Sequence, residues 1–453
     1  MLLALLLAIV GLCLFGQALD FYCVIFRELE AALLSVQRML LACLAFWCGT
    51  FIFLTFNQKN WPLIGLLLVA IIVYFSGDVE DFKTSGAIIL LAGVTLGRGV
   101  SFALTRGGEN HAKCVNCRSV IVNFLVGLVT LLAFSACWRL NMAGNYHGPR
   151  WMGLWNNPNT YGMLMGAGLA LAVGLLMRDR RLQMADGENE MQNPGREFAI
   201  GCRNRLLCVY ASIKSAIGNW QSAILCVAAG MMAVGLFFSY SRGAWVGTLV
   251  GLLYLAKAHG KLKWRWVLSG IPVVTAAVCF FWHSTADTDL WYLKRLDFSR
   301  PSAQHRVVAW CGALQMIRDH PFGVGWDNAV DVYEKNYSPP ENGAAAINMN
   351  DYLMLGTQLG IPGLLCFVTY VGMCFKSRPR LDKIRGVNAD GEDKLACRAA
   401  ALAMAMAFWF DGGLFTLATA AVFWILLENG ACDSERKRQT RDTTNKAMLL
   451  YWW

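Results

Sequence analysis

Residues 222–257 read SAILCVAAGMMAVGLFFSYSRGAWVGTLVGLLYLAK, and this stretch decides the fold class. Two apolar segments, 222–239 and 244–257, flank a short polar turn that contains Arg242. Segments of this composition are typical of membrane-spanning helices. A guanidinium at the edge of a bilayer is costly unless it serves a ligand or partner. We therefore expect Arg242 to bind an anion that reaches it within or beside the membrane.

The rest of the chain extends this pattern. Hydrophobic residues make up 56% of the 453 residues and charged residues only 15%, which is typical of integral membrane proteins. Windows of about 19 residues predict about twelve spans. They cover 2–18, 38–56, 61–76, 86–104, 119–137, 161–177, 222–239, 244–257, 266–282, 352–375, 398–410 and 414–428. We expect an all-α, polytopic membrane protein that forms a single domain over residues 1–453.

Lysine and arginine concentrate in alternate loops, chiefly within 178–214 and 376–398. The positive-inside rule places these loops and both termini in the cytoplasm. We expect the first span to be retained, because it lacks the basic start of a secretory signal. Residues 283–351 then form one long periplasmic loop, and 178–221 a polar cytoplasmic linker. This topology also explains the net charge of +10 without nucleic-acid binding, since no soluble module interleaves basic and aromatic residues.

An amphipathic helix is predicted within the long loop. Apolar residues recur there at helical spacing up to a proline, at Val307, Trp310, Leu314, Ile317 and Pro321. Arg306 falls in the first turn of this helix, where backbone N–H groups and a planar guanidinium both favour phosphate. Snorkelling to lipid headgroups is the simpler interpretation of one such arginine. Arg242 and Arg306 together predict a lipid-tethered phosphate, such as a polyprenyl pyrophosphate.

Cysteine chemistry is not expected to organise the fold. Half of the 16 cysteines lie inside predicted spans, where cysteine acts as a small apolar residue. His111, Cys114 and Cys117 resemble half of a zinc site. A structural zinc site needs four ligands, and no second pair of comparable spacing is present. We therefore predict no metal site.

Three runs in the C-terminal half carry a family resemblance. They are FSYSRGA at residues 238–244, RVVAWCGALQMIRDHPFGVG at residues 306–325, and NDYL at residues 350–353 followed by GIPGL at residues 360–364. In sequence and order these runs resemble the signatures of the O-antigen ligase and O-antigen polymerase family. The layout of about twelve spans with one long outer loop is also what that family implies.

The resemblance implies a glycosyltransferase of cell-surface polysaccharide biosynthesis in the bacterial inner membrane. Such an enzyme transfers a glycan from undecaprenyl pyrophosphate to an acceptor hydroxyl on the periplasmic side, with inversion and without a metal or other cofactor. It implies that Arg242 and Arg306 hold the pyrophosphate leaving group. The acceptor is a lipid-core sugar in a ligase, another glycan repeat in a polymerase, or a protein hydroxyl, and the sequence leaves this choice open.

One departure from the family pattern concerns the group that activates the acceptor. The family's third signature has a histidine at the position of Met349, and its usual glutamate is replaced by Gln358. Methionine takes no proton, so a substitute base is needed unless a positioned hydroxyl suffices. The candidates are Asp351, His305, His320 and Asp411, with Asn350, His320 and Asp411 also suited to acceptor contact or loop support. Asp351 has an alternative role in capping the span that follows it.

The sequence leaves open the role of residues 151–161 and the choice between an enzyme, a transporter and a binding protein. Aromatic and amide residues between Trp151 and Tyr161 suit either a sugar chain or an aromatic belt at the membrane interface. The same arginines would serve a transporter of an anion or of the lipid-linked glycan, although no paired Gly- or Pro-interrupted spans support one. An inactive relative that only binds the lipid carrier is the remaining alternative.

Overall fold

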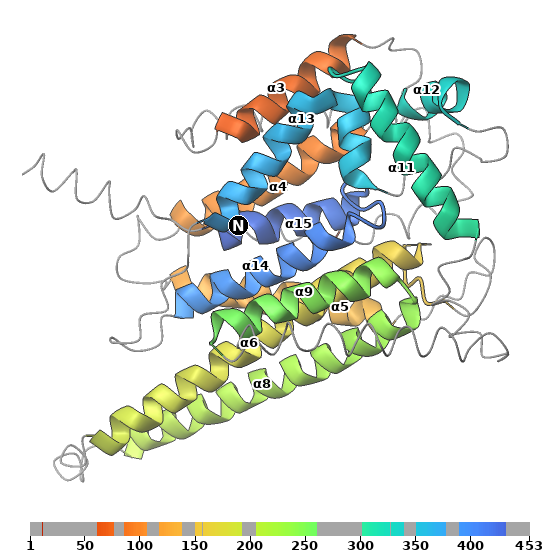
Figure 1. The fold of residues 1–453 in the computed structure, drawn as a ribbon. Helices are drawn as coiled ribbons and strands as arrows, with labels where there is room; N and C mark the ends of the chain where they lie inside the picture. Colours follow the sequence, from red (N-terminus) through yellow and green to blue (C-terminus); the bar gives the residue numbers. More distant parts are fainter. Residues whose placement is uncertain are drawn as a thin grey trace, which may run out of the picture.

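The computed structural model describes residues 11, 61–76, 86–106, 117–137, 150–155, 157–192, 205–260, 301–326, 328–338, 350–376 and 389–431. Every regular element within these ranges is a helix (Figure 1). In chain order the helices are α3 (Trp61–Ser76), α4 (Gly86–Arg106), α5 (Cys117–Cys137), α6 (Pro158–Gln192), α8 (Arg205–Ser239), α9 (Arg242–Ala258), α11 (Pro301–Asp319), α12 (Ala329–Asn336), α13 (Asp351–Lys376), α14 (Ala389–Ala407) and α15 (Leu417–Gly430). The all-α prediction is confirmed for this part of the chain.

Three of these helices have a segment long and apolar enough to cross a bilayer: Pro158–Leu182, Trp220–Ser239 and Asp351–Lys376. Shorter apolar helices occupy Trp61–Val73, Ile89–Ser101, Ile121–Cys137 and Leu417–Gly430. The spans predicted at 38–56 and 266–282, and the one at 2–18 apart from residue 11, lie outside the described residues. The total of about twelve spans and the periplasmic loop therefore stay predictions.

The helices form a packed bundle with α14 near its centre. α14 contacts α6, α9 and α15, while α15 also packs on α4, and α13 packs on α3 (Figure 1). The core includes the fully buried rings of Phe408, Phe423 and Trp424. The apolar window of α6 is 78% buried, against 33% in α8, so α6 is an inner helix and α8 presents apolar side chains outward. Exposed apolar side chains are what a lipid-facing surface requires.

Close packing between α9 and α14 fixes how the ends of these two helices meet. Glycines recur every fourth residue on the face of α9 that contacts alanines of α14; they are Gly243, Gly247 and Gly251, opposite Ala399, Ala403 and Ala407. A Cβ on Gly251 would lie 2.6 Å from the carbonyl oxygen of Ala399. Small residues at such intervals let two helix backbones approach closely. The first residue of α9, Arg242, is thereby held beside the turn that follows α14.

The segment after α11 docks into a break in α13. Gly360 has φ 70°, and Pro362 follows it, so the helix is interrupted there. The carbonyl oxygens of Thr357 and Gln358 instead accept hydrogen bonds from Val324 N (2.9 Å) and Gly325 N (3.2 Å). The run at 321–325 and the run at 360–364 are therefore two halves of one joint, and this joint anchors the C-terminal end of α11.

Two local predictions are corrected. The segment 178–221 was expected to be a polar linker, but α6 continues to Gln192 and α8 already begins at Arg205. A hydropathy window finds only the apolar part of a helix, whereas here α6 and α8 continue as a packed pair beyond it (Figure 1). The second correction is that α11 begins at Pro301, so Arg306 is not in its first turn. Proline is favoured at a helix start, and the polar residues after it extend the helix upstream.

Candidate active site

Arg242 begins α9 directly after a tight turn. Ser241 is the N-cap, and its Oγ accepts a hydrogen bond from Ala244 N at 3.3 Å. Ser239 Oγ accepts from Ser241 N at 3.2 Å and donates to Leu236 O at 2.7 Å. Between these serines Tyr240 has φ 49°, a left-handed conformation that is uncommon for a tyrosine. The Ser-Tyr-Ser run thus places Arg242 at the helix start by local hydrogen bonds.

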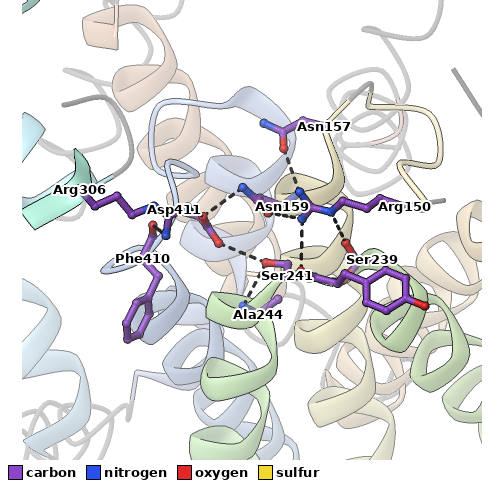
Figure 2. Close-up of polar contacts among 10 residues, drawn as sticks. Arg150, Asn157, Asn159, Ser239, Ser241, Ala244, Arg306, Phe410 and Asp411 are labelled. Carbon is purple, nitrogen blue, oxygen red and sulfur yellow. Dashed lines mark hydrogen bonds and ion pairs between the residues drawn. The ribbon is translucent and has the colours of Figure 1, made fainter. Parts of the chain in front are cut away.

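Asp411 lies at the centre of the polar groups at this end of the bundle (Figure 2). It sits in the turn between α14 and α15 and is 3% exposed. Its Oδ1 accepts from Asn159 Nδ2 at 3.0 Å and lies 3.3 Å from the guanidinium of Arg306. Its Oδ2 accepts from Ser241 Oγ at 3.1 Å. One carboxylate therefore joins the starts of α6 and α9 to α11.

Three arginines surround this carboxylate. Arg306 contacts it directly and also donates to the carbonyl oxygen of Phe410 at 3.2 Å. The charges of Arg150 and Arg242 act on it as well. Burial raises the pKa of Asp411 above its ordinary value, and the three arginines and the Ser241 hydroxyl lower that pKa without cancelling the effect of burial. The cluster is thus suited to an anionic ligand and contains one carboxyl group that takes up a proton more readily than an ordinary aspartate.

The structure brings Arg242, Arg306 and Asp411 together among the residues proposed from sequence. Asp351 lies close by, with Oδ2 accepting from Gly413 N and Leu414 N, each at 2.7 Å. It therefore braces the turn that carries Asp411. Its remaining effect on the cluster is electrostatic, since its charge and that of Asp411 repel each other.

Two other predicted residues have local roles. Asn350 is fully buried, and its Oδ1 accepts from Tyr352 N (3.0 Å) and Leu353 N (3.2 Å). Helix capping, which was considered for Asp351, thus belongs to Asn350. His320 is exposed just after α11, where its carbonyl oxygen accepts from Gly323 N at 2.9 Å. It takes no part in the contacts of Figure 2. Met349 and the side chain of His305 lie outside the described residues.

The aromatic run before α6 is packed inside the protein. Trp151 stacks on Phe238 with ring centroids 4.7 Å apart, and the backbone N–H of Trp151 donates to the carbonyl oxygen of Phe238 at 2.9 Å. Trp155 is 4% exposed and packs near Tyr161. These rings tie the segment before α6 to the end of α8. That segment carries Arg150, which the sequence interpretation did not single out.

The proposed half zinc site falls mostly outside the described part of the chain. His111 and Cys114 are not described, and Cys117 begins α5. Within the described ranges no three residues of the metal-ligating types lie together. The prediction about this segment is therefore neither supported nor contradicted.

The described helices, three of them long and apolar enough to cross a membrane, define the class: a helical, membrane-type protein with a polar cluster at one end of its bundle. In this cluster Arg150 is buried, whereas Arg242 and Arg306 are half-buried. Residues 227–368 match the family model described as O-Antigen ligase, which confirms the resemblance seen in the three runs. The match supports a relationship to that family over this part of the chain. No curated protein matches the chain.

The matched range contains Arg242, Arg306 and Asp351 but ends before Asp411 and begins after Arg150. Arg150 and Asp411 therefore lie outside the range that the family model matches. The available sequence signal for Arg150 was its place in an outer connection with few basic residues. Its partners are 89 and 9 residues away along the chain, and only the fold shows that they meet.

Proposed function

We propose that this protein transfers a glycan from undecaprenyl pyrophosphate to an acceptor hydroxyl at the periplasmic face of the inner membrane. The observation that carries this proposal is the arrangement of Arg150, Arg242 and Arg306 around Asp411 at one end of the apolar bundle. Among the described residues at this end, these three arginines exceed the two carboxylates of Asp411 and Asp351. A pyrophosphate on a polyprenyl chain is an anion that the bilayer itself delivers to such a site.

The contacts of Arg306 suit an exchange of partners on donor binding. Its bonds to Phe410 O and Asp411 Oδ1 are 3.2 and 3.3 Å long, and its side chain is 24% exposed. Charge-assisted hydrogen bonds at their strongest are about 2.7 to 2.9 Å. A pyrophosphate therefore competes well for this guanidinium. With Arg242, it would neutralise the charge that grows on the leaving group, which is the electrostatic form of transition-state stabilisation.

Asp411 is the base in this proposal, in place of the family histidine. The acceptor oxygen bonds to the anomeric carbon while the bond from that carbon to the pyrophosphate oxygen breaks. The acceptor proton passes to the carboxylate, and the pyrophosphate departs with the bonding electrons. A raised pKa favours this role, because a base works best when its pKa approaches the working pH. Asp351 suits the role less well, because the two N–H groups that it accepts are fixed backbone donors, whereas one donor to Asp411 is the Arg306 side chain, which can change partners.

The experiment is a transfer assay with purified protein and lipid-linked glycan, using glycan, lipid-core and protein acceptors in parallel. Arg242→Lys and Arg306→Lys should each lose about 2 to 3 kcal/mol of transition-state stabilisation, since one ammonium cannot reproduce a forked phosphate contact. Arg181→Lys is the matched control. It lies at the opposite end of the bundle, and its contact with Glu392 Oε1 at 2.9 Å is one that a lysine can make.

Full activity in either site variant would remove that arginine from the site. Failure of the native protein with every acceptor, combined with retained binding of the lipid pyrophosphate, would favour the transport or binding-only alternative. The acceptor that supports transfer distinguishes ligase, polymerase and protein glycosylation.

A further inference from the structure

Arg150 is buried in the segment before α6, and its guanidinium is held by several acceptors (Figure 2). Its Nε donates to the carbonyl oxygen of Ser239 at 2.9 Å. Its NH2 group donates to Asn159 Oδ1 at 2.8 Å and lies 3.4 Å from the carbonyl oxygen of Tyr240. One cation thus contacts both the turn before Arg242 and the first turn of α6.

These contacts determine which way the Asn159 amide faces. A guanidinium has only donors, so the amide end that meets Arg150 must be the oxygen. The nitrogen end is then directed at Asp411 Oδ1, 3.0 Å away. The backbone of Asn159 is fixed as well, since its N–H donates to Asn157 Oδ1 at 2.9 Å. A reversed amide would place two acceptor oxygens against each other beside Asp411.

We propose that Arg150 is a positioning residue that acts through Asn159: it locks the amide so that Asp411 keeps a hydrogen-bond donor, and stays charged, when Arg306 turns to the donor pyrophosphate. This inference rests on the proposed function in one respect, namely that Arg306 leaves Asp411 when the lipid-linked pyrophosphate binds. The Arg150–Asn159–Asp411 relay itself is a property of the protein without substrate.

The need for the relay follows from the groups that face Asp411. Arg306 of α11 and Arg242 of α9 stabilise its charged form, whereas Asp351 of α13 opposes it. If Arg306 releases the carboxylate, burial favours the neutral acid, which accepts no proton from an acceptor hydroxyl. Among the described residues, the direct donors that remain are then the Ser241 hydroxyl and the Asn159 amide. The charge of Arg150 lowers the pKa of Asp411, and the amide is the group that connects the two.

A purely structural role for Arg150 makes a different prediction. In that case its bonds to the carbonyl oxygens of Ser239 and Tyr240 are what matters, and Asn159 is incidental. Asn159→Leu separates the two roles, because it removes the amide and leaves those backbone contacts in place. Asn429→Leu is a matched control: Asn429 is also half-buried on a helix, and its Nδ2 donates to Ile425 O at the other end of the bundle.

The first test is the pH dependence of transfer. In Asn159→Leu, kcat should fall about tenfold or more at neutral pH. The KM for the lipid-linked glycan should change less than about twofold, because in this proposal Asn159 does not contact that substrate. The fall of kcat on the acid side should begin at higher pH than in the native protein. Arg150→Gln should show the same displacement, and Arg150→Lys part of it. Asn429→Leu should follow the native profile.

The second test does not depend on transfer. Protein labelled with ¹³C at aspartate carboxyl groups is titrated in nanodiscs, and infrared spectroscopy follows the protonated carboxyl band that Asp411→Asn removes. The midpoint of this band should move to higher pH in Asn159→Leu. An unchanged midpoint would overturn the relay and leave Arg150 as a structural clamp. A displaced midpoint in a protein that transfers no glycan would uphold the relay and refute the proposed function.

Discussion

Both ends of the α9–α14 pair bury charged side chains, but the charges are combined differently. At the end opposite Asp411, Arg178 contacts Asp179 at 2.6 Å and Asp393 at 2.7 Å. In the same region Glu392 contacts Arg181 at 2.9 Å and His259 at 2.8 Å. Arg178 and Arg181 thus each have a close acidic partner. At the Asp411 end, three arginines act on one carboxylate, and the direct ion pair is 3.3 Å long.

The difference indicates what each cluster is for. Short, buried and paired charges leave little to gain from a further ion, and they hold α6, α9 and α14 together. At the Asp411 end the direct ion pair is longer, so Arg306 gains more from an incoming anion than the paired arginines do. Both clusters combine arginines with carboxylates, and the length of the direct ion pair distinguishes a brace from a candidate site.

The largest expected effect concerns the side of the membrane on which each cluster lies. The distribution of lysine and arginine predicts that the Asp411 end is periplasmic and the paired cluster cytoplasmic. A reporter fused after Asn336, near the end of α12, should report from outside. A reporter fused after Asp390, at the start of α14, should report from inside. Signals from one common compartment would refute the topology and the periplasmic site built on it.

The second effect compares two buried aspartates of the same end. Asp411→Asn should lower kcat by about 10²- to 10⁴-fold, the range that general-base catalysis supplies. Asp351→Asn should lower kcat less than about tenfold, while the free energy of unfolding falls by about 1 kcal/mol because a neutral oxygen replaces a charged acceptor. Steady-state kinetics and thermal unfolding in detergent measure both. Equal losses of kcat with intact stability would instead make Asp351 the base, as the sequence suggested.

The pH dependence of the native protein has a defined sign. Activity requires the ionised form of Asp411, so it should fall as the pH falls through the raised pKa, at higher pH than the usual value of 3.8 allows. Stability should change in the opposite direction. Because the folded pKa lies above the unfolded one, protonation relieves the burial of charge, and this group favours the folded state more as the pH falls. Asp411→Asn should remove both dependences.

The sequence predicted the helices well where composition alone decides them. The spans expected at 61–76, 86–104 and 352–375 agree closely with α3, α4 and α13. It also found Arg242 and Arg306, since a charged group among apolar spans is conspicuous. Polar helix extensions were missed, because the apolar window ends where the lipid-facing segment ends. That is why α6 is much longer than the span expected at 161–177.

The centre of the site was only one of several equal candidates in the sequence. Asp411 and Asp351 each adjoin the end of a predicted span, His320 follows the predicted loop helix, and nothing local separates them. Asp411 is distinguished by Asn159, Ser241 and Arg306, which lie 252, 170 and 105 residues away along the chain. Arg150 was not predicted as a site residue for the same reason. Such contacts result from helix packing and have no periodicity for a pattern to detect.

A smaller effect is expected from restoring the family histidine. If Asp411 already serves as the base, Met349→His should raise transfer by less than about tenfold in the native background. It should rescue transfer more strongly in Asp411→Asn, where a proton acceptor is missing, up to the range of general-base catalysis. Kinetics of the single and double variants decide this. A large gain in the native background would show that Asp411 contributes little as a base.

The smallest expected effect tests whether the two ends are mechanically joined through α9 and α14. Gly247 lies midway along α9, and a methyl group there would overlap the carbonyl oxygen of Ala403. Gly247→Ala should cost about 1 to 3 kcal/mol of stability, the usual range for overpacking. Gly230→Ala in α8 is the matched control, because its added Cβ has no described atom within 4 Å and alanine favours a helix by about 0.5 to 1 kcal/mol.

Separating α9 from α14 should strain the 3.3 Å ion pair between Arg306 and Asp411 before the shorter ion pairs at the other end. Transfer should therefore fall by a few-fold at temperatures where the protein is still folded. A Gly247→Ala protein that is destabilised yet fully active below its unfolding temperature would show that the site tolerates movement of α9.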